Sequence, residues 1–274
     1  MHLPKPGNAH VLDLFSLKGK VAVVTVWLNQ NEWNITGGSR GIGLEIVKAY
    51  AEAGASIASI YRSSSTAENV AADLSSTHGV TIRAYQCDVS DETAVDAVFE
   101  RIVADFGKID ILVANAGICY TVAAEDMSTA EFRSEMGVNF DGPWFCARAA
   151  AKYFKAQGSG NVIFTTSISG MIVNIPDKQA IYNASKAGLI HLAKSLSIEW
   201  IDFCRVNCVS PGYIWTDMLE QVPKELSDEW VALTPAKRMG ETYELKGAYL
   251  FCASNASSFM TGANIVVDGA YTVP

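Results

Sequence analysis

This chain of 274 residues lacks the features that identify membrane, disordered and secreted proteins. No apolar run approaches the roughly 18 residues of a transmembrane helix. The N-terminus has neither the apolar core of a signal peptide nor the Arg-rich pattern of a transit peptide. With 49% hydrophobic and 18% charged residues, the composition is too apolar for a disordered chain. We therefore expect a globular, cytoplasmic protein.

Paired cysteines and an excess of basic charge are also absent. None of the six cysteines forms a CxxC pair, and zinc ligation by Cys204 and Cys208 would need partners that the spacing does not provide. We expect buried free thiols, as in a reducing cytosol, and no metal site. Basic residues number 21 against 29 acidic ones, and the net charge of −8 argues against a nucleic-acid-binding or membrane-binding surface.

Short β-rich segments alternate with longer helical patterns along the chain. Apolar runs of this length are typical of strands that helices cover on both faces. The expected strands span 21–25, 56–61, 81–87, 110–115, 161–166, 205–210 and 264–268. The expected helices span 42–53, 67–77, 91–106, 131–157, 180–202 and 243–253. The alternation predicts an α/β fold with one doubly wound parallel sheet of about seven strands, in one domain that covers nearly the whole chain.

A glycine-rich turn, TGGSRGIG at 36–43, precedes the first expected helix. Glycines let the backbone approach a pyrophosphate closely, and the helix N-terminus supplies N–H donors and the positive end of its dipole. The position of this turn after a hydrophobic strand favours dinucleotide binding over an ordinary tight loop. The cofactor-binding residues expected here are Gly37, Ser39, Arg40, Gly41, Ile42 and Gly43.

The residues after the second expected strand indicate which dinucleotide is bound. A carboxylate there would bind the ribose 2′-hydroxyl of NAD, whereas an arginine accommodates the 2′-phosphate of NADP. Arg62 and Ser63 follow this strand, and the next acidic residue is Glu68. Together with Arg40, they offer two guanidinium groups and a hydroxyl to a phosphate. The sequence thus predicts NADP(H); the alternative is that both arginines are solvated surface charges.

Four motifs occur in the order found in the short-chain dehydrogenase/reductase family. They are TGGSRGIG at 36–43, NAG at 115–117, YNASK at 182–186 and PG at 211–212. The chain resembles this family from about residue 12 to its C-terminus, which implies a single Rossmann-type domain at 12–274 after an N-terminal extension at 1–11. The segments VLDLFSLKGKVAVVT, SISGMIVNIP, FCRVNCVSPGYIWTDM and TGANIVVDGAYT look like its fungal branch. That branch comprises NADP-linked mannitol dehydrogenases, sorbose and xylulose reductases and stereoselective carbonyl reductases.

Ketone reduction can be assigned to a tyrosine and a lysine. The reaction needs a hydride donor and an acid that protonates the developing alkoxide. A tyrosine hydroxyl has an ordinary pKa near 10, which is too high for ready proton exchange at neutral pH. Lys186 lies one helical turn beyond Tyr182 on the same face, where its cation favours the ionised tyrosine. We expect this pair to be catalytic and to contact the cofactor; the alternative is a solvated pair on a surface helix.

A second hydroxyl should hold the carbonyl oxygen, and Ser167 and Ser169 are the candidates. The resemblance selects Ser167, which precedes x-x-Gly, and leaves Ser169 to face the substrate or stabilise a turn. It also matches Asn139 to the family asparagine, whose helix distortion holds a water in a proton relay to the lysine. Capping of a kinked helix is a compatible role for that residue. The expected substrate contacts are Ser167, Ser169, Asn174 and Tyr182.

The resemblance places further cofactor contacts after later strands. Asp88, with Val89, would meet the adenine, although capping of a turn is an alternative role. The remaining expected contacts are Asn115, Ala116, Gly117, Pro211, Gly212, Ile214 and Thr216. Substrate specificity is expected from residues 171–176, from Cys119 and Tyr120, and from the segment 215–230. The sequence does not decide between a polyol and a hydrophobic ketone.

The long helices expected at 131–157 and 180–202 carry apolar residues on more than one face, including Trp144, Leu192 and Trp200. One sheet cannot cover all of these, which suggests that the helices pair with copies of themselves. The resemblance implies a homotetramer, with the C-terminal tail at 271–274 joining a second interface. A homodimer is the alternative.

An insertion interrupts the family pattern, which would run VAVVTGGSRGIG. The chain has an excess of 11 residues, at about 26–36, between the first strand and the glycine-rich turn. It is either a looped-out bulge, an artefact of gene annotation, or a modified cofactor site. The first two are favoured, and deletion of 26–36 is then expected to tighten NADPH binding and raise thermal stability.

These features together predict an NADPH-dependent reductase of a ketose or other carbonyl compound, which also catalyses the reverse polyol oxidation. One alternative is a non-catalytic dinucleotide-binding or scaffold protein disabled by the insertion. Another is a reductase of a specialised biosynthetic pathway. The complete set of Ser167, Tyr182, Lys186 and Asn139 argues against a protein without catalysis.

Overall fold

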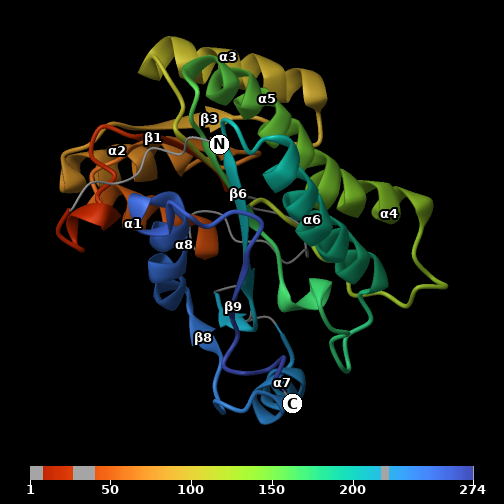
Figure 1. Cartoon of the computed structure of the whole chain (residues 1–274). Coiled ribbons are helices and arrows are strands. Elements are labelled where there is room, and N and C mark those ends of the chain that lie inside the picture. Colours follow the sequence, from red (N-terminus) through yellow and green to blue (C-terminus); the bar gives the residue numbers. More distant parts are fainter. Residues whose placement is uncertain (1–8, 27–40, 217–221, 274) are drawn as a thin grey trace.

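The computed structural model describes residues 9–26, 41–216 and 222–273 (Figure 1). In this part of the chain, a seven-stranded parallel sheet has the order β3-β2-β1-β4-β5-β6-β9. The strands are β1 (Val21–Thr25), β2 (Ser56–Tyr61), β3 (Ile82–Gln86), β4 (Ile111–Ala114), β5 (Asn161–Thr165), β6 (Arg205–Pro211) and β9 (Asn264–Val267). The strand order reverses between β1 and β4, where ligands of doubly wound sheets bind at the carboxyl ends. The predicted sheet is confirmed.

Helices cover both faces of this sheet (Figure 1). Helices α1, α2 and α8 contribute to the core on one face, and α3, α5 and α6 contribute to the core on the other. The helices are α1 (Ile42–Glu52), α2 (Ala67–His78), α3 (Glu92–Phe106), α4 (Thr129–Met136), α5 (Gly142–Gln157), α6 (Ala180–Glu199), α7 (Lys224–Leu233) and α8 (Lys246–Ala253). Among the described residues, no helix is both long and apolar enough to cross a membrane.

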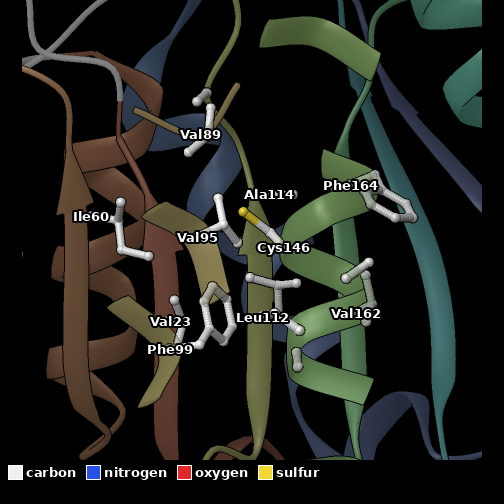
Figure 2. Packing of buried hydrophobic residues seen from close by; sticks show 14 of the residues in the cluster. Val23, Ile60, Val89, Val95, Phe99, Leu112, Ala114, Cys146, Val162 and Phe164 are labelled. Carbon is white, nitrogen blue, oxygen red and sulfur yellow. The ribbon is translucent and has the colours of Figure 1, made fainter. Parts of the chain in front are cut away.

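Strand residues alternate between the two cores because successive side chains point to opposite faces of a strand. In β1, Val23 packs in the same core as Phe99 of α3 and Leu112 of β4 (Figure 2). Its neighbours Ala22 and Val24 pack in the opposite core. Both faces of the sheet are therefore buried away from water. This explains why the strands are continuous apolar runs in the sequence. The six cysteines are buried and free, as expected.

The helix expected at 131–157 is divided into two by a π-helical turn. Helix α4 starts at a capping box formed by Ser128 and Glu131, and the turn spans Gly137–Asp141 before α5 begins. Pro143 lies in the first turn of α5 and has no N–H, so it cannot donate an α-helical bond to the carbonyl of Asn139. The distortion is thus centred on the residue that the family resemblance selects.

Three short elements in the last third of the chain were not expected from the sequence. Helix α7 overlaps the segment 215–230, which was expected only to influence specificity, and extends beyond it to Leu233. The short strands β7 (Ile214–Trp215) and β8 (Gly240–Glu241) pair in parallel as a separate two-stranded sheet. Such short segments carry no clear periodicity, and their pairing brings together residues far apart in the sequence.

Candidate active site

The first crossover brings α1 close to the ends of two strands. Gly41 caps α1 with a φ of 90°, a conformation that side chains other than glycine rarely adopt. A Cβ atom on Gly43 would lie 2.2 Å from Val26 Cγ1 and 2.8 Å from Asn115 Nδ2. Only glycine at position 43 therefore allows α1 to pack this closely against Val26 and Asn115. The N-terminus of α1, at Ile42, lies at the carboxyl edge of the sheet. The predicted residues Gly37, Ser39 and Arg40, and 27–36 of the insertion, lie outside the described residues.

Thr25, at the end of β1, holds the segment that follows β4. Its Oγ1 accepts hydrogen bonds from the backbone N–H groups of Asn115 at 2.9 Å and Ala116 at 3.0 Å. The Asn115 side chain donates in return to the Thr25 carbonyl at 3.1 Å. The predicted residues 115–117 are thus fixed beside α1. Sequence reasoning missed Thr25, whose one signal is a hydroxyl at the end of an otherwise apolar strand.

Arg62 and Asp88 meet at the ends of β2 and β3. Arg62 Nε lies 3.1 Å from Asp88 Oδ2, and Gln86 donates to the Arg62 carbonyl at 3.0 Å. Asp88 also accepts from the backbone and hydroxyl of Ser90, so it has the turn-capping role considered above. The guanidinium and the neighbouring Ser63 form a donor set that fits a phosphate monoester. Val89 is buried next to this pair.

Asn139 connects the segment after β4 to α6. Its Oδ1 accepts from the N–H of Ile118 at 2.8 Å, and its Nδ2 donates to the Ile118 carbonyl at 2.7 Å and to Ser185 Oγ at 3.3 Å. The Ser185 hydroxyl in turn donates to the carbonyl of Tyr182 at 2.7 Å. Asn139 is fully buried, and its hydrogen bonds hold the segment after β4 and helix α6 in place relative to each other.

Tyr182 and Lys186 occupy the first turns of α6. Lys186 Nζ lies 5.5 Å from the centre of the Tyr182 ring and donates to the Thr165 carbonyl at 3.0 Å. Burial lowers the pKa of Lys186 to about 8. Burial also raises the pKa of Tyr182, with a smaller contribution from Cys119, and hydrogen bonding with Ser167 opposes both. The lysine can therefore exchange a proton close to neutral pH.

The two serines after β5 are linked to one another. Ser167 Oγ donates to Ser169 Oγ at 3.0 Å and accepts from the backbone N–H of Ser169 at 3.1 Å. Ser167 also interacts with the Tyr182 hydroxyl, and this interaction counters part of the rise in the pKa of Tyr182. Gln179, which sequence reasoning missed, places Nε2 3.2 Å from Ser169 Oγ and 3.2 Å from Asn174 Oδ1. Its only signal was an amide just before the helix that carries Tyr182.

Asp177 joins the loop between β5 and α6 to α7. Its carboxylate accepts from the Tyr213 hydroxyl at 2.7 Å and from Trp230 Nε1 at 3.1 Å. The rings of Tyr213 and Trp230 stack with centres 4.7 Å apart, and Asn174 Nδ2 donates to the same hydroxyl at 3.1 Å. Trp230 is buried in this contact, whereas Trp215 is exposed.

The predicted residues after β6 lead from the sheet to this loop. Pro211 ends β6, and the N–H of Gly212 donates to the Val267 carbonyl at 3.0 Å. Ile214 is buried in β7, and Thr216 is the last described residue before 222. The carboxyl ends of β1, β4, β5 and β6 therefore contribute to one region, as expected for a parallel sheet.

Known proteins resemble the chain over nearly its full length. The family model described as Enoyl-(Acyl carrier protein) reductase matches residues 37–272. The chain is 46% identical to a sorbose reductase of Candida albicans and 43% identical to a probable NADP-dependent mannitol dehydrogenase of Yarrowia lipolytica; each match covers 97% of this chain and 92% of the relative. The solved NADPH-dependent 3-quinuclidinone reductase of Rhodotorula rubra has a TM-score of 0.90 at 39% identity, covering 99% of this chain and 97% of that one.

Proposed function

Because this chain belongs to the short-chain dehydrogenase/reductase family and is an NADP-dependent oxidoreductase acting on CH–OH groups, we propose that it reduces a ketose or a related carbonyl compound. The reverse reaction is the oxidation of a polyol. The observation that carries this proposal is the grouping of Ser167, just after β5, with Tyr182 and Lys186, in the first turns of α6. Relatives named for sorbose, mannitol and L-xylulose support the class of substrate.

The residues present fit the cofactor. The N-terminus of α1 at Gly41 suits a diphosphate, because its N–H groups have no partner within the helix. Arg62 and Ser63 would hold the 2′-phosphate, and residues 115–117 would line the ribose and nicotinamide side. When bound, NADPH supplies the hydride for the carbonyl carbon.

The proton would come from Tyr182. Ser167 Oγ holds the carbonyl oxygen and donates a hydrogen bond that strengthens as charge develops there. The Tyr182 hydroxyl donates its proton to the alkoxide, and the nearby Lys186 ammonium stabilises the phenolate that remains. Lys186 can then return a proton, since its pKa of about 8 is close to the ambient pH. Asn139, with its carbonyl freed by Pro143, would support this return path.

Polar side chains favour a hydroxylated substrate over a purely apolar one. Ser169 bonds with Ser167, and Gln179 links Ser169 to Asn174, so that two amides and a hydroxyl form one network that reaches Ser167. Amide groups of this kind both donate to and accept from sugar hydroxyls. A polyol or ketose is therefore the proposed substrate class.

Association into a homotetramer or a homodimer completes the proposal, and we place the protein in the cytoplasm. Ile198 on α6 is 71% exposed, and near it Trp144 stacks on Trp200 with ring centres 6.5 Å apart. Such an apolar helix face is typical of an interface between copies of a chain. Light scattering at micromolar concentration should give a multimeric mass, and a monomeric mass would contradict this assembly.

The acid/base role is tested by Tyr182→Phe in the full chain. Phenylalanine keeps the packing and removes only the hydroxyl, so turnover should fall by about a hundredfold or more, while NADPH binding survives. Ketose substrates such as fructose, sorbose and xylulose should be compared with an aryl ketone. Tyr243→Phe is the matched control, because this tyrosine is 62% exposed and its loss should change nothing.

Two outcomes would contradict the proposal. Near-normal turnover by Tyr182→Phe would exclude the acid/base role. NADPH binding without turnover of any carbonyl compound in the panel would favour the non-catalytic alternative.

A further inference from the structure

Glu135 is a buried carboxyl group that the mechanism above does not use. It lies in α4 one helical turn before Asn139, and none of its surface is exposed. Its Oε1 accepts a hydrogen bond from the backbone N–H of Tyr120 at 3.0 Å. Its Oε2 is buried without a hydrogen-bond partner in the described part of the chain. A carboxyl with one unpaired buried oxygen is costly, so its position needs a reason beyond holding one backbone group.

The segment after β4 lies between Glu135 and Lys186: Tyr120 bonds with Glu135, and a Cβ atom on Gly117 would lie 3.4 Å from Lys186 Nζ. Three titratable groups interact electrostatically with Glu135 across this segment. They are Cys119, from the segment after β4, and Tyr182 and Lys186, from α6. Burial raises the pKa of Glu135 to about 7, and the Tyr120 N–H and the charge of Lys186 oppose this increase. The negative charge of Glu135 in turn contributes to the raised pKa of Tyr182 and partly counters the lowering of the Lys186 pKa by burial.

We propose that Glu135 is a positioning residue whose charge sets the pH at which the Tyr182–Lys186 pair releases its proton. Loss of one proton makes the pair more negative by one charge, whichever member gives it up. A neighbouring carboxylate opposes that loss. Above pH 7, where Glu135 is mostly ionised, the pair therefore stays protonated to higher pH, which favours ketone reduction over alcohol oxidation. This inference rests on the acid/base role proposed above for Tyr182.

The test is Glu135→Gln in the full chain, with the pH dependence of kcat measured for alcohol oxidation with NADP⁺. The amide keeps an oxygen for the Tyr120 N–H and removes the charge. The midpoint of the oxidation profile should move down by about half to one pH unit, a threefold to tenfold change in proton affinity. Glu131→Gln is the matched control, because it removes the same charge one turn earlier, at the capping box, and should leave the midpoint in place.

A second readout needs no cofactor. The pKa of Glu135 in the folded protein, about 7, exceeds that of an unfolded glutamate, about 4.3. Wild-type stability should therefore fall as pH rises between these values, because the buried carboxyl must ionise. Glu135→Gln lacks this loss. The difference between its melting temperature and that of the wild type should therefore shift in favour of the variant from pH 5 to pH 8.

An unmoved kinetic midpoint, with activity reduced evenly at every pH, would overturn the inference and leave Glu135 a purely structural residue. If Glu135→Gln folds poorly, Glu135→Met removes the charge at similar volume and gives the same test. Failure of this inference is distinct from failure of the proposed function: in the first case Tyr182→Phe still loses turnover, and in the second it does not.

Discussion

The two halves of the central sheet bury different kinds of side chain. Among the described residues before 115, Thr25 is the buried polar side chain, and the rest of the interior there is apolar. Beyond 115 the interior contains hydroxyls, amides and charges. These include Glu135, Asn139, Asn161, Thr165, Thr166, Ser167, Ser169, Asn174, Ser185, Lys186, Arg205, Asn207 and Ser210. The first half has an apolar interior, and the second half contains the proposed catalytic residues.

Not all of the buried polarity in the second half serves the reaction. Asn161 donates to the carbonyls of Cys252 and Ala253, and Arg205 donates to those of Cys252 and Met260. These bonds satisfy backbone groups that the packing of α8 against β5 and β6 would otherwise bury unpaired. Polar groups near the carboxyl ends of the strands surround Tyr182, whereas these lie elsewhere and stabilise the fold. Position along the strand therefore separates the two roles.

The largest effect is expected on the free energy of unfolding, from a substitution in the apolar half alone. Phe99→Ala removes a ring that is 1% exposed in the core shared with Val23 and Leu112 (Figure 2). The free energy of unfolding should fall by about 3–5 kcal/mol, because a cavity remains. Chemical denaturation measures this loss, and kcat below the melting temperature should stay near that of the wild type. Phe132→Ala is the control, since Phe132 is 42% exposed. A large loss of kcat in Phe99→Ala would contradict the separation of an apolar half from a catalytic one.

A smaller effect is expected where the apolar half meets the cofactor. Arg62→Asp removes the guanidinium beside Asp88 and adds a second negative charge there. NADPH binding should weaken by about 1–3 kcal/mol, as for loss of a hydrogen bond to a charged group, while NADH binding is unharmed or improved. Calorimetric titration of both cofactors measures the difference. Arg83→Asp makes the same charge change at a partner of Asp105 and should bind NADPH normally; equal affinity of the wild type for both cofactors would refute the role of Arg62.

The smallest effect is expected on KM, from a substitution in the loop that joins the proposed catalytic residues to α7. Asp177→Asn keeps one acceptor oxygen but loses the charge that strengthens the bonds from Tyr213 and Trp230. A loss of about 1 kcal/mol should raise KM roughly fivefold and leave kcat within about twofold. Asp228→Asn, at a carboxylate on α7 that is 62% exposed, is the control. A fall in kcat with unchanged KM would place Asp177 in the chemistry instead.

Most of the fold could be predicted because apolar periodicity is strong where both faces of a sheet are covered. Each expected strand occurs within about a residue of its predicted limits, as with Val21–Thr25 and Ser56–Tyr61. Periodicity did not show the π-helical turn at Gly137–Asp141, because the turn depends on a missing hydrogen bond; only the family resemblance placed a distortion at Asn139. Helix α7 has a short, weakly patterned sequence, and the contacts of Trp230 with Tyr213 and Asp177 fix its position.

The sequence by itself determined the cofactor class and indicated the proposed catalytic set, because both depend on residue types at short spacing. The four-residue separation of Tyr182 and Lys186 places them on one helix face in any α-helix. Only the tertiary structure decided which other groups surround them. Glu135, Thr25 and Gln179 come from different elements, and their sequence neighbourhoods carry no motif. Their roles depend on burial and on hydrogen bonds between distant segments, which exist only once the strands have aligned.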